Sequence, residues 1–275
     1  PDEPRSGDRF SLVTRLDLAL VERGLVSSRT KAQRLITDGF VSVDGVAVTK
    51  PSTPVDPASD VTLQAQQVDV GRGASKLRAA LARWMVPVAG ATCVDIGAST
   101  GGFTQVLLEH QADRIVAVDV GHGQLDPSLR HDPRVVVREG VHAASLTPTW
   151  WAESGLPEPV SVVVVDVSFI SLGKILPALV GTFGVHSHYV LLVKPQFEVG
   201  RTAVSEGVVK NVSDREQALT DVAHTCRDLG VTVRDVMVSP ITGEAGNVEY
   251  LAYASATSSV HPAEWDGSAP KPTDR

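Results

Sequence analysis

The sequence has 275 residues, 43% of them hydrophobic, and its 25 Lys and Arg against 32 Asp and Glu give a formal net charge of −7. This length and hydrophobic fraction suffice for one sizeable α/β core with a small additional module. No apolar run reaches the roughly 18 residues of a membrane span, and the polar first ten residues contain no hydrophobic signal segment, so we expect a cytoplasmic protein that does not enter membranes. The cysteines, Cys93 and Cys226, lie in strand and helical patterns, which indicates buried, reduced thiols and no metal cluster.

The charge is distributed unevenly along the chain. From Arg9 to Lys50 there are seven Lys or Arg and four Asp or Glu, so this segment is basic and the remainder is strongly acidic. Such asymmetry indicates a basic module on an acidic body, a pattern typical of proteins that contact nucleic acid. A solvated helix face would carry the same charge and is the alternative.

The first 65 residues predict a small domain of two helices and several short strands. Residues 1–12 we expect to be disordered. Thr14 and Ser28 each precede a helical pattern that ends at a glycine, and each is a candidate N-cap. Asp44-Gly45 between two alternating apolar runs predicts a hairpin, and residues 61–63 predict a further strand.

The segment SSRTKAQRLITDGFVSVDG resembles the S4 RNA-binding module along its length. We therefore interpret residues 13–65 as an S4-like α+β domain. The resemblance implies that a pair of helices presents basic side chains to structured RNA, where phosphate contacts supply affinity. The candidates for these contacts are Arg15, Arg29, Lys31 and Arg34.

Residues 66–74 are polar and contain glycine, which predicts a linker. Beyond it, strand and helical patterns alternate up to residue 255. The expected strands are 92–96, 115–119, 134–138, 160–166, 189–193, 231–238 and 247–254. The continuous apolar run 160–165 predicts a central parallel strand buried on both faces. Residues 213–216 have the pattern of a capping box that opens a helix. The pattern is that of a doubly wound α/β sheet over residues 75–255, followed by a disordered tail at 256–275.

A glycine-rich loop, Gly97 to Gly102, follows the first strand of this sheet directly after Asp95 and Ile96. Its glycines allow positive φ angles and a close approach of the backbone to a ligand. The next strand ends at Asp119, 22 residues beyond Gly97, where an acid commonly accepts hydrogen bonds from a ribose diol. The pattern predicts a nucleoside-bearing cofactor but does not say which one. An ordinary tight turn is the alternative.

Charged residues also follow two later strands, at Asp166 and Lys194. The carboxyl ends of parallel strands meet at one edge of a sheet, so both side chains are expected in one crevice. With Lys76 and Glu249 they form a set of two lysines and two acids that is spread over the chain. Each member alone could be a surface charge or half of a structural ion pair.

Six segments carry a closer resemblance: GRGASKL, VDIGASTGGFT, VDVGHGQL, VVVVDVSFISL, LLVKPQFEVG and GNVEYLAY. Together they are similar to the TlyA (hemolysin A) family of ribosomal RNA 2'-O-methyltransferases, which combine an S4 module with an FtsJ-like domain. The similarity covers roughly residues 13–255. It implies a class I (Rossmann-like) methyltransferase that uses S-adenosylmethionine and acts on the 2'-hydroxyl of cytidine in ribosomal RNA of the small subunit, and in some members of the large subunit.

The resemblance also implies roles for single residues. Its catalytic tetrad corresponds to Lys76, Asp166, Lys194 and Glu249. A ribose 2'-hydroxyl is a poor nucleophile, so it needs a base or a cation at its oxygen. Lys194 would accept the proton, Asp166 would hold Lys194 near the methyl group, and Lys76 and Glu249 would orient the hydroxyl. Which lysine is the base stays open.

For the cofactor, residues 97–103 are expected to cradle the methionine and ribose, Asp119 the ribose hydroxyls, and Val120 the adenine. His142 stands near the expected adenine site, where the family usually has Asn. The complete expected set is Asp95, Gly97, Ala98, Ser99, Thr100, Gly101, Gly102, Phe103, Asp119, Val120, Gly121, Gln124, His142 and Asp166. Ser168 and Phe169 would position the target nucleotide, Phe169 by stacking on a flipped base. A place in the core is the alternative for Phe169.

Other activities fit the sequence less well. Methylation of a base amino group usually relies on an Asn/Asp-Pro-Pro-aromatic loop, where this chain has Lys194-Pro195-Gln196-Phe197. Methylation at pyrimidine C5 needs a nucleophilic cysteine. A nicotinamide-dependent oxidoreductase would explain the glycine loop but not the S4-like segment. The two remaining alternatives to a methyltransferase are a membrane-active hemolysin and a non-catalytic rRNA-binding factor.

Overall fold

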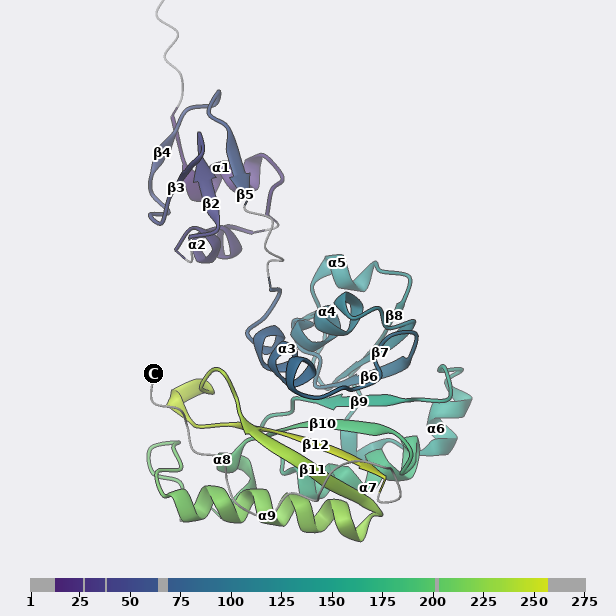
Figure 1. Ribbon diagram of the computed structural model, residues 1–275. Helices are drawn as coiled ribbons and strands as arrows, with labels where there is room; N and C mark the ends of the chain where they lie inside the picture. Colours follow the sequence, from purple (N-terminus) through teal and green to yellow (C-terminus); the bar gives the residue numbers. More distant parts are fainter. Residues whose placement is uncertain (1–12, 27, 38, 64–68, 201–202, 257–275) are drawn as a thin grey trace, which may run out of the picture. The chain divides into compact units, whose positions relative to one another are not determined.

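The computed structural model describes residues 13–26, 28–37, 39–63, 69–200 and 203–256. The chain divides into two compact units between Val68 and Asp69, which we call unit 1 and unit 2 (Figure 1). The expected disordered ends, at residues 1–12 and beyond 256, and residues 66–68 of the expected linker lie outside the described residues.

Unit 1 packs two helices against short strands around a small apolar core. Its helices are α1 (Leu16–Glu22) and α2 (Arg29–Thr37). A three-stranded antiparallel sheet has the order β3-β2-β5, and β1 pairs with β4. These strands are β1 (Thr14–Arg15), β2 (Val41–Val43), β3 (Val46–Ala47), β4 (Pro54–Val55) and β5 (Val61–Leu63). The buried residues recur at helical spacing, which explains why both helices form here.

One of the two expected N-caps of unit 1 is wrong. Thr14 lies in strand β1, opposite Val55, and helix α1 begins after Arg15, whose side chain makes no capping bond. The pairing with a distant strand therefore overrides the local capping pattern. Ser28 does act as expected, since its Oγ accepts a hydrogen bond from the backbone N–H of Lys31 at 3.3 Å.

Unit 2 is built on a seven-stranded sheet with the order β11-β12-β10-β9-β6-β7-β8 (Figure 1). The strands are β6 (Thr92–Ile96), β7 (Arg114–Asp119), β8 (Val135–Glu139), β9 (Val162–Val165), β10 (His188–Val193), β11 (Val231–Val238) and β12 (Tyr250–Ala256). Strands β8, β7, β6, β9 and β10 pair in parallel. The chain moves outward from β6 to β8 and then returns to β9 on the other side of β6. This reversal creates a crevice at the carboxyl ends of β6 and β9.

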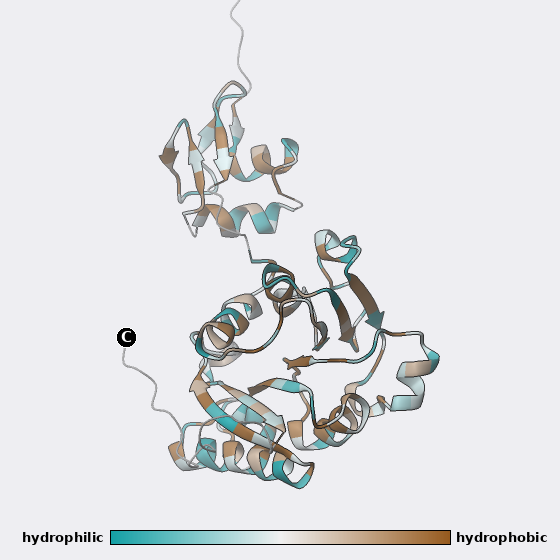
Figure 2. Cartoon of the chain, turned by 45° about the vertical axis from the view of Figure 1, so that its right-hand side comes forward, coloured by the Kyte–Doolittle hydropathy of each residue, from teal (hydrophilic) through white to brown (hydrophobic). Residues whose placement is uncertain are grey.

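Helices cover both faces of this sheet. They are α3 (Gly73–Arg83), α4 (Gly102–Glu109), α5 (Pro127–Arg130), α6 (Pro148–Glu153), α7 (Leu172–Phe183), α8 (Pro195–Glu198) and α9 (Val212–Asp228), with short 3-10 helices η1 (Ala143–Ser145) and η3 (Glu244–Gly246). On β9, Val163 and Val165 pack with α7 and α9 in one core cluster, and Val162 and Val164 pack with α3 and α4 in another. The expectation of a central strand buried on both faces is confirmed, and Figure 2 shows hydrophobic residues along the inner strands.

Three details differ from the sequence expectations. Strand β12 is antiparallel and lies between β10 and β11, because the chain doubles back after β11. Helix α9 begins at Val212 after Asn211, so the Ser213 capping pattern is unused. Helix α3 begins at Gly73, within the expected linker. Among the described residues, no helix is both long and apolar enough to cross a bilayer.

Candidate functional site

The site begins at the glycine-rich loop between β6 and α4. Gly97 has a φ angle of +83°, and a Cβ atom there would overlap the backbone carbonyl oxygen of Asp166. Only glycine therefore allows the end of β6 to lie directly against the end of β9. This close approach brings the loop and the charged residues after β9 to the same crevice.

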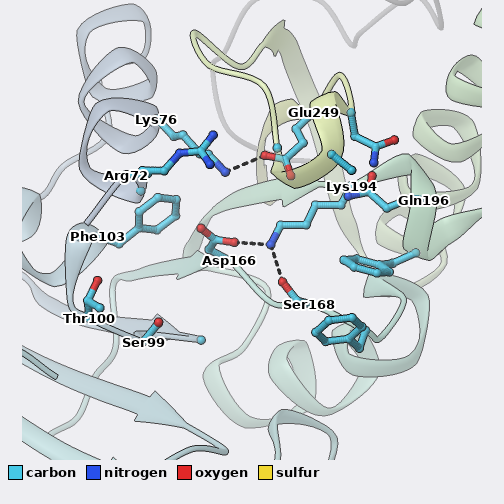
Figure 3. A pocket seen from close by; sticks show the side chains of 18 of the residues that line it. Arg72, Lys76, Ser99, Thr100, Phe103, Asp166, Ser168, Lys194, Gln196 and Glu249 are labelled. Carbon is cyan, nitrogen blue, oxygen red and sulfur yellow. Dashed lines mark hydrogen bonds and ion pairs between the residues drawn. The ribbon is translucent and has the colours of Figure 1, made fainter. Parts of the chain in front are cut away.

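A pocket of about 540 Å³ opens at this edge of the sheet (Figure 3). Its walls come from the β6 loop, the start of α3, the ends of β9 and β10, and the segment before β12. The expected site residues that line it are Lys76, Gly97, Ala98, Ser99, Thr100, Gly102, Phe103, Asp166, Ser168, Phe169, Lys194 and Glu249. This volume is in the range of small-molecule sites, roughly 300–1,000 Å³.

The first ion pair of the pocket joins the ends of the neighbouring strands β9 and β10. The Nζ atom of Lys194 lies 2.7 Å from Oδ1 of Asp166 and donates a hydrogen bond to Oγ of Ser168 at 2.8 Å (Figure 3). Lys194 is 8% exposed. Two partners thus hold the ammonium group at the pocket wall.

The second ion pair joins residues 173 positions apart in the sequence. Nζ of Lys76, on α3, lies 2.6 Å from Oε2 of Glu249, just before β12. Both side chains are buried, at 7% and 3% exposure. The desolvation of two ion pairs beside one cavity is unfavourable, which is more typical of a functional site than of a core built for stability. The structure thus brings all four charged residues of the expected tetrad to one pocket.

Glu249 is held by contacts of two residues, Gly243 and Asn247, for which the sequence indicated no role. A Cβ atom on Gly243 would overlap the Glu249 carboxylate, so only glycine leaves room for it. The buried Asn247 donates from Nδ2 to the carbonyl of Gly207 at 2.7 Å and accepts from the N–H of Val209 at 3.1 Å. These contacts fix the wall of the pocket that carries Glu249.

Two phenylalanines lie together at the pocket. Phe169 is 90% exposed, which excludes the alternative that it belongs to the core. Its ring centroid lies 5.2 Å from that of Phe197, on α8. Sequence reasoning missed Phe197, together with the lining residues Arg72 and Gln196. The exposed aromatic surface offers a place for an unstacked base.

Several expected cofactor residues lie outside the lining of this pocket. Asp119 accepts hydrogen bonds from the backbone N–H groups of Ser99 at 2.8 Å and Gly121 at 2.6 Å. The exposed Gln124 accepts from the hydroxyl of Ser99 at 3.2 Å. Val120 is 65% exposed at the end of β7. The expected residues Asp119, Val120, Gly121 and Gln124 thus lie at the end of β7 and just after it, and Asp119 and Gln124 contact the glycine-rich loop at Ser99.

His142 caps the 3-10 helix η1, because its Nδ1 accepts a hydrogen bond from the N–H of Ala144 at 3.2 Å. The side-chain oxygen of Asn would make the same capping bond. The departure from the Asn expected at this position therefore preserves the local backbone structure.

Asp95 supports the loop from inside the protein. It has no exposed surface, and its Oδ2 accepts a hydrogen bond from the hydroxyl of Thr104 at 2.6 Å. Its Oδ1 has no hydrogen-bond partner among the described residues, and burial raises the pKa of Asp95 to about 7. Asp95 therefore lies behind the loop and outside the lining of the pocket.

The expected RNA-binding residues of unit 1 lie on or beside its two helices. The guanidinium groups of Arg15 and Arg29 both contact Asp17, and both side chains remain about half exposed. Lys31 lies on α2 and is partly exposed. Arg34 also lies on α2, and its side chain is outside the described part of the structure.

Comparisons with known proteins show which families the two units match. Residues 70–256 match the family of FtsJ-like methyltransferases, and residues 14–61 match the S4 domain. The chain is 46% identical over 242 residues to the 16S/23S rRNA (cytidine-2'-O)-methyltransferase TlyA of Mycobacterium tuberculosis, covering 87% of this chain and 88% of that protein.

Two further relatives were found. The chain is 38% identical over 240 residues to hemolysin A of Brachyspira hyodysenteriae, covering 87% and 98% of the two proteins. A solved structure from Streptococcus thermophilus, described as a hemolysin, superposes with a TM-score of 0.67 at 38% identity and covers 90% of each chain. All three alignments extend over most of both proteins in the pair.

Proposed function

The chain belongs to the TlyA family of FtsJ-like methyltransferases with an N-terminal S4 domain, and from this premise we propose that it methylates the 2'-hydroxyl of a cytidine in ribosomal RNA with S-adenosylmethionine as donor. The observation that carries the proposal is the presence of two ion pairs, Lys194–Asp166 and Lys76–Glu249, at one pocket beside the glycine-rich loop. The small-subunit RNA is the first substrate to test, and large-subunit RNA the second. With a ribosomal substrate, we propose that the enzyme acts in the cytoplasm.

The residues around the loop suit S-adenosylmethionine by their chemistry. The Asp119 carboxylate accepts two backbone hydrogen bonds and keeps lone pairs for the ribose hydroxyls. Val120 offers exposed apolar surface for the adenine, and Ser99 and Thr100 offer hydroxyls at the pocket wall. These residues and the backbone of 97–102 would hold the cofactor. When bound, it supplies an electrophilic methyl group on a sulfonium.

The protein's own contribution is to place and activate the sugar hydroxyl. Asp166 and Ser168 fix the position of the Lys194 Nζ. The ammonium proton of Lys194 passes to the paired Asp166 carboxylate, and the neutral amine that results takes the proton of the hydroxyl. Lys76, paired with Glu249, orients the sugar from the opposite wall. Correct placement of the reacting atoms can contribute about 7–11 kcal/mol, so a rigid arrangement of four side chains is well suited to this reaction.

We expect the target cytidine to leave its stack when its ribose enters the pocket. The exposed ring of Phe169, which packs against the partly buried ring of Phe197, would receive the unstacked base. Unit 1 would supply affinity for the RNA through phosphate contacts, which carry little sequence information.

Methylation at pyrimidine C5 is disfavoured, since it needs a reactive thiol. Both cysteines are buried, neither lines the pocket, and burial raises the pKa of each thiol to about 12.

The test is methyl transfer from labelled S-adenosylmethionine to purified ribosomal subunits, followed by digestion of the RNA to nucleosides. The expected product is 2'-O-methylcytidine. Label on a base, or no transfer to either subunit despite cofactor binding, would overturn the proposal.

A further inference from the structure

Asp17, the second residue of α1, is completely buried in unit 1. A carboxylate removed from water needs charged or hydrogen-bonding partners, because its desolvation is otherwise strongly unfavourable. Asp17 takes no part in the proposed chemistry. We therefore infer the role of Asp17 from the side chains that donate hydrogen bonds to it.

Four hydrogen bonds reach this one carboxylate. Arg15 donates from Nε to Oδ1 and from Nη2 to Oδ2, both at 3.0 Å. Arg29 donates from Nε to Oδ2 at 3.0 Å, and Gln33 from Nε2 to Oδ2 at 2.9 Å. Arg15 precedes α1, whereas Arg29 and Gln33 lie on α2. The carboxylate thus draws two cations from different elements to one point.

The outer sides of both guanidinium groups remain available. The side chains of Arg15 and Arg29 are 44% and 53% exposed. A guanidinium carries five N–H donors, and Arg15 uses two of them on Asp17 and Arg29 one. Each arginine is therefore fixed on its inner side and keeps donors on its outer side. Phosphate oxygens in a fork geometry are the ligands that such donors bind best.

We propose that Asp17 is a positioning residue for RNA, which holds Arg15 and Arg29 side by side so that their outer donors bind neighbouring phosphates. This inference rests on the proposed function. A free arginine side chain loses rotamer freedom when it binds a phosphate, and Asp17 imposes that order before the RNA arrives. The acid thereby promotes binding of a polyanion, although its own charge repels one.

Repulsion of RNA by Asp17 and positioning of the arginines by Asp17 predict opposite changes in RNA affinity when the acid is removed. Asp17→Asn removes a negative charge beside the basic surface, so electrostatics alone predicts tighter RNA binding. If Asp17 positions Arg15 and Arg29, the same substitution should instead weaken RNA binding. We expect the full-length variant to bind purified small ribosomal subunits with a Kd raised about tenfold at 0.1 M salt, and with a salt slope shallower by about one, the slope that one phosphate contact contributes. Cofactor affinity and kcat at saturating subunits stay unchanged.

Two further variants separate the loss of a negative charge from the loss of the contact between Asp17 and Arg15. Glu22→Gln removes the same charge from an exposed position at the end of α1, and we expect its RNA affinity to be equal to or tighter than that of the unaltered protein. Arg15→Lys keeps the charge but loses the two-point contact with Asp17, and we expect weaker RNA binding. Arg15→Lys keeps the test decisive if Asp17→Asn fails to fold.

A double-mutant cycle separates positioning from a merely structural role. In a protein that already carries Arg15→Lys and Arg29→Lys, adding Asp17→Asn should change the Kd less than about twofold, because the groups through which Asp17 acts are gone. Unchanged or tighter RNA binding by both Asp17→Asn and Arg15→Lys would overturn the inference. If the unaltered chain neither binds nor methylates the subunits, it is the proposed function that fails.

Discussion

Asp17 and Asp95 are both completely buried, one in each unit, yet their surroundings shift their pKa values in opposite directions. Chiefly the hydrogen bond from Arg15 holds the pKa of Asp17 well below its usual range. Asp95 accepts a hydrogen bond from the neutral hydroxyl of Thr104 and has no arginine partner among the described residues, and burial raises its pKa to about 7. Burial alone therefore does not decide the charge of a carboxylate; the donors that accompany it do.

The cations of the two units also differ, in how far they are exposed to solvent. In unit 1, Arg15 and Arg29 surround a buried acid and remain half exposed. In unit 2, Lys76 and Lys194 are buried, Glu249 is buried as well, and Asp166 is partly exposed at the pocket. Exposed charges are screened by salt, whereas buried pairs are screened much less. We therefore expect changes in unit 1 to alter salt-dependent RNA affinity, and changes in unit 2 to alter the chemical step.

The largest effect is expected for Lys194→Ala. Loss of the amine at the pocket removes both the proton acceptor and the partner of Asp166, so kcat should fall by about 100- to 10,000-fold, the usual contribution of a positioned acid or base. Cofactor affinity, measured by calorimetry, should stay within about threefold, since the proposed cofactor contacts lie on the loop.

Lys174→Ala is the matched control, because Lys174 is exposed on α7. It should leave turnover unchanged. Substantial turnover by Lys194→Ala would remove Lys194 from the catalytic machinery and leave Lys76 as the candidate base.

Gly243→Ala should have the next largest effect. The added methyl group would overlap the Glu249 carboxylate and displace it from Lys76. A displacement of about 1 Å can lower kcat about a hundredfold. Single-turnover measurements at low and high salt should show equal losses. Gly181→Ala is the control, because a Cβ there meets no atom within 4 Å. Normal kcat in Gly243→Ala would show that the position of Glu249 is not critical.

Arg29→Glu should weaken RNA binding without changing cofactor affinity. The reversed charge lies next to Asp17 on the exposed side of unit 1. We expect the Kd for ribosomal subunits to rise about tenfold at low salt, with the difference shrinking as salt increases. An unaltered Kd would contradict the S4-type role of this face and, with it, the contrast between the two units.

The sequence predicted the features that local patterns specify. A long apolar run followed by a charged residue predicts the end of a buried parallel strand, and this placed Asp166 and Lys194 at one edge of the sheet. Family motifs added Lys76 and Glu249, whose contact spans most of the chain. The exposure of Phe169 decided between two interpretations that its sequence context left open.

Features that depend on distant backbone could not be predicted. Thr14 has the pattern of a cap, but its pairing with Val55 makes it a strand residue. Asp17 resembles an ordinary exposed acid in the first turn of a helix, and only the fold surrounds it with three donor side chains. Asn247 acts on a loop 40 residues away, which no periodicity in the sequence reveals.

The smallest effect on activity, and the most direct test of the contrast between the two buried acids, is expected from Asp95→Asn. The folded pKa of Asp95, about 7, exceeds the value of about 3.9 for an unfolded Asp. Between these values the folded protein holds a proton that the unfolded chain releases, so the stabilising contribution is complete below pH 4 and is lost as the pH rises through 7.

Asn does not titrate. The free energy of unfolding of Asp95→Asn relative to the unaltered protein should therefore increase between pH 4 and pH 8, by a few kcal/mol at most. All four tryptophans lie beyond residue 68, so their fluorescence during urea unfolding reports on unit 2. Unit 1 contains no tryptophan, so the unfolding of Asp17→Asn is followed by circular dichroism instead. For this variant the slope should have the opposite sign, because the stabilisation by a lowered pKa is present above pH 4 and is lost as the pH falls. Parallel pH profiles for the two variants would show that the two acids have the same electrostatic environment after all.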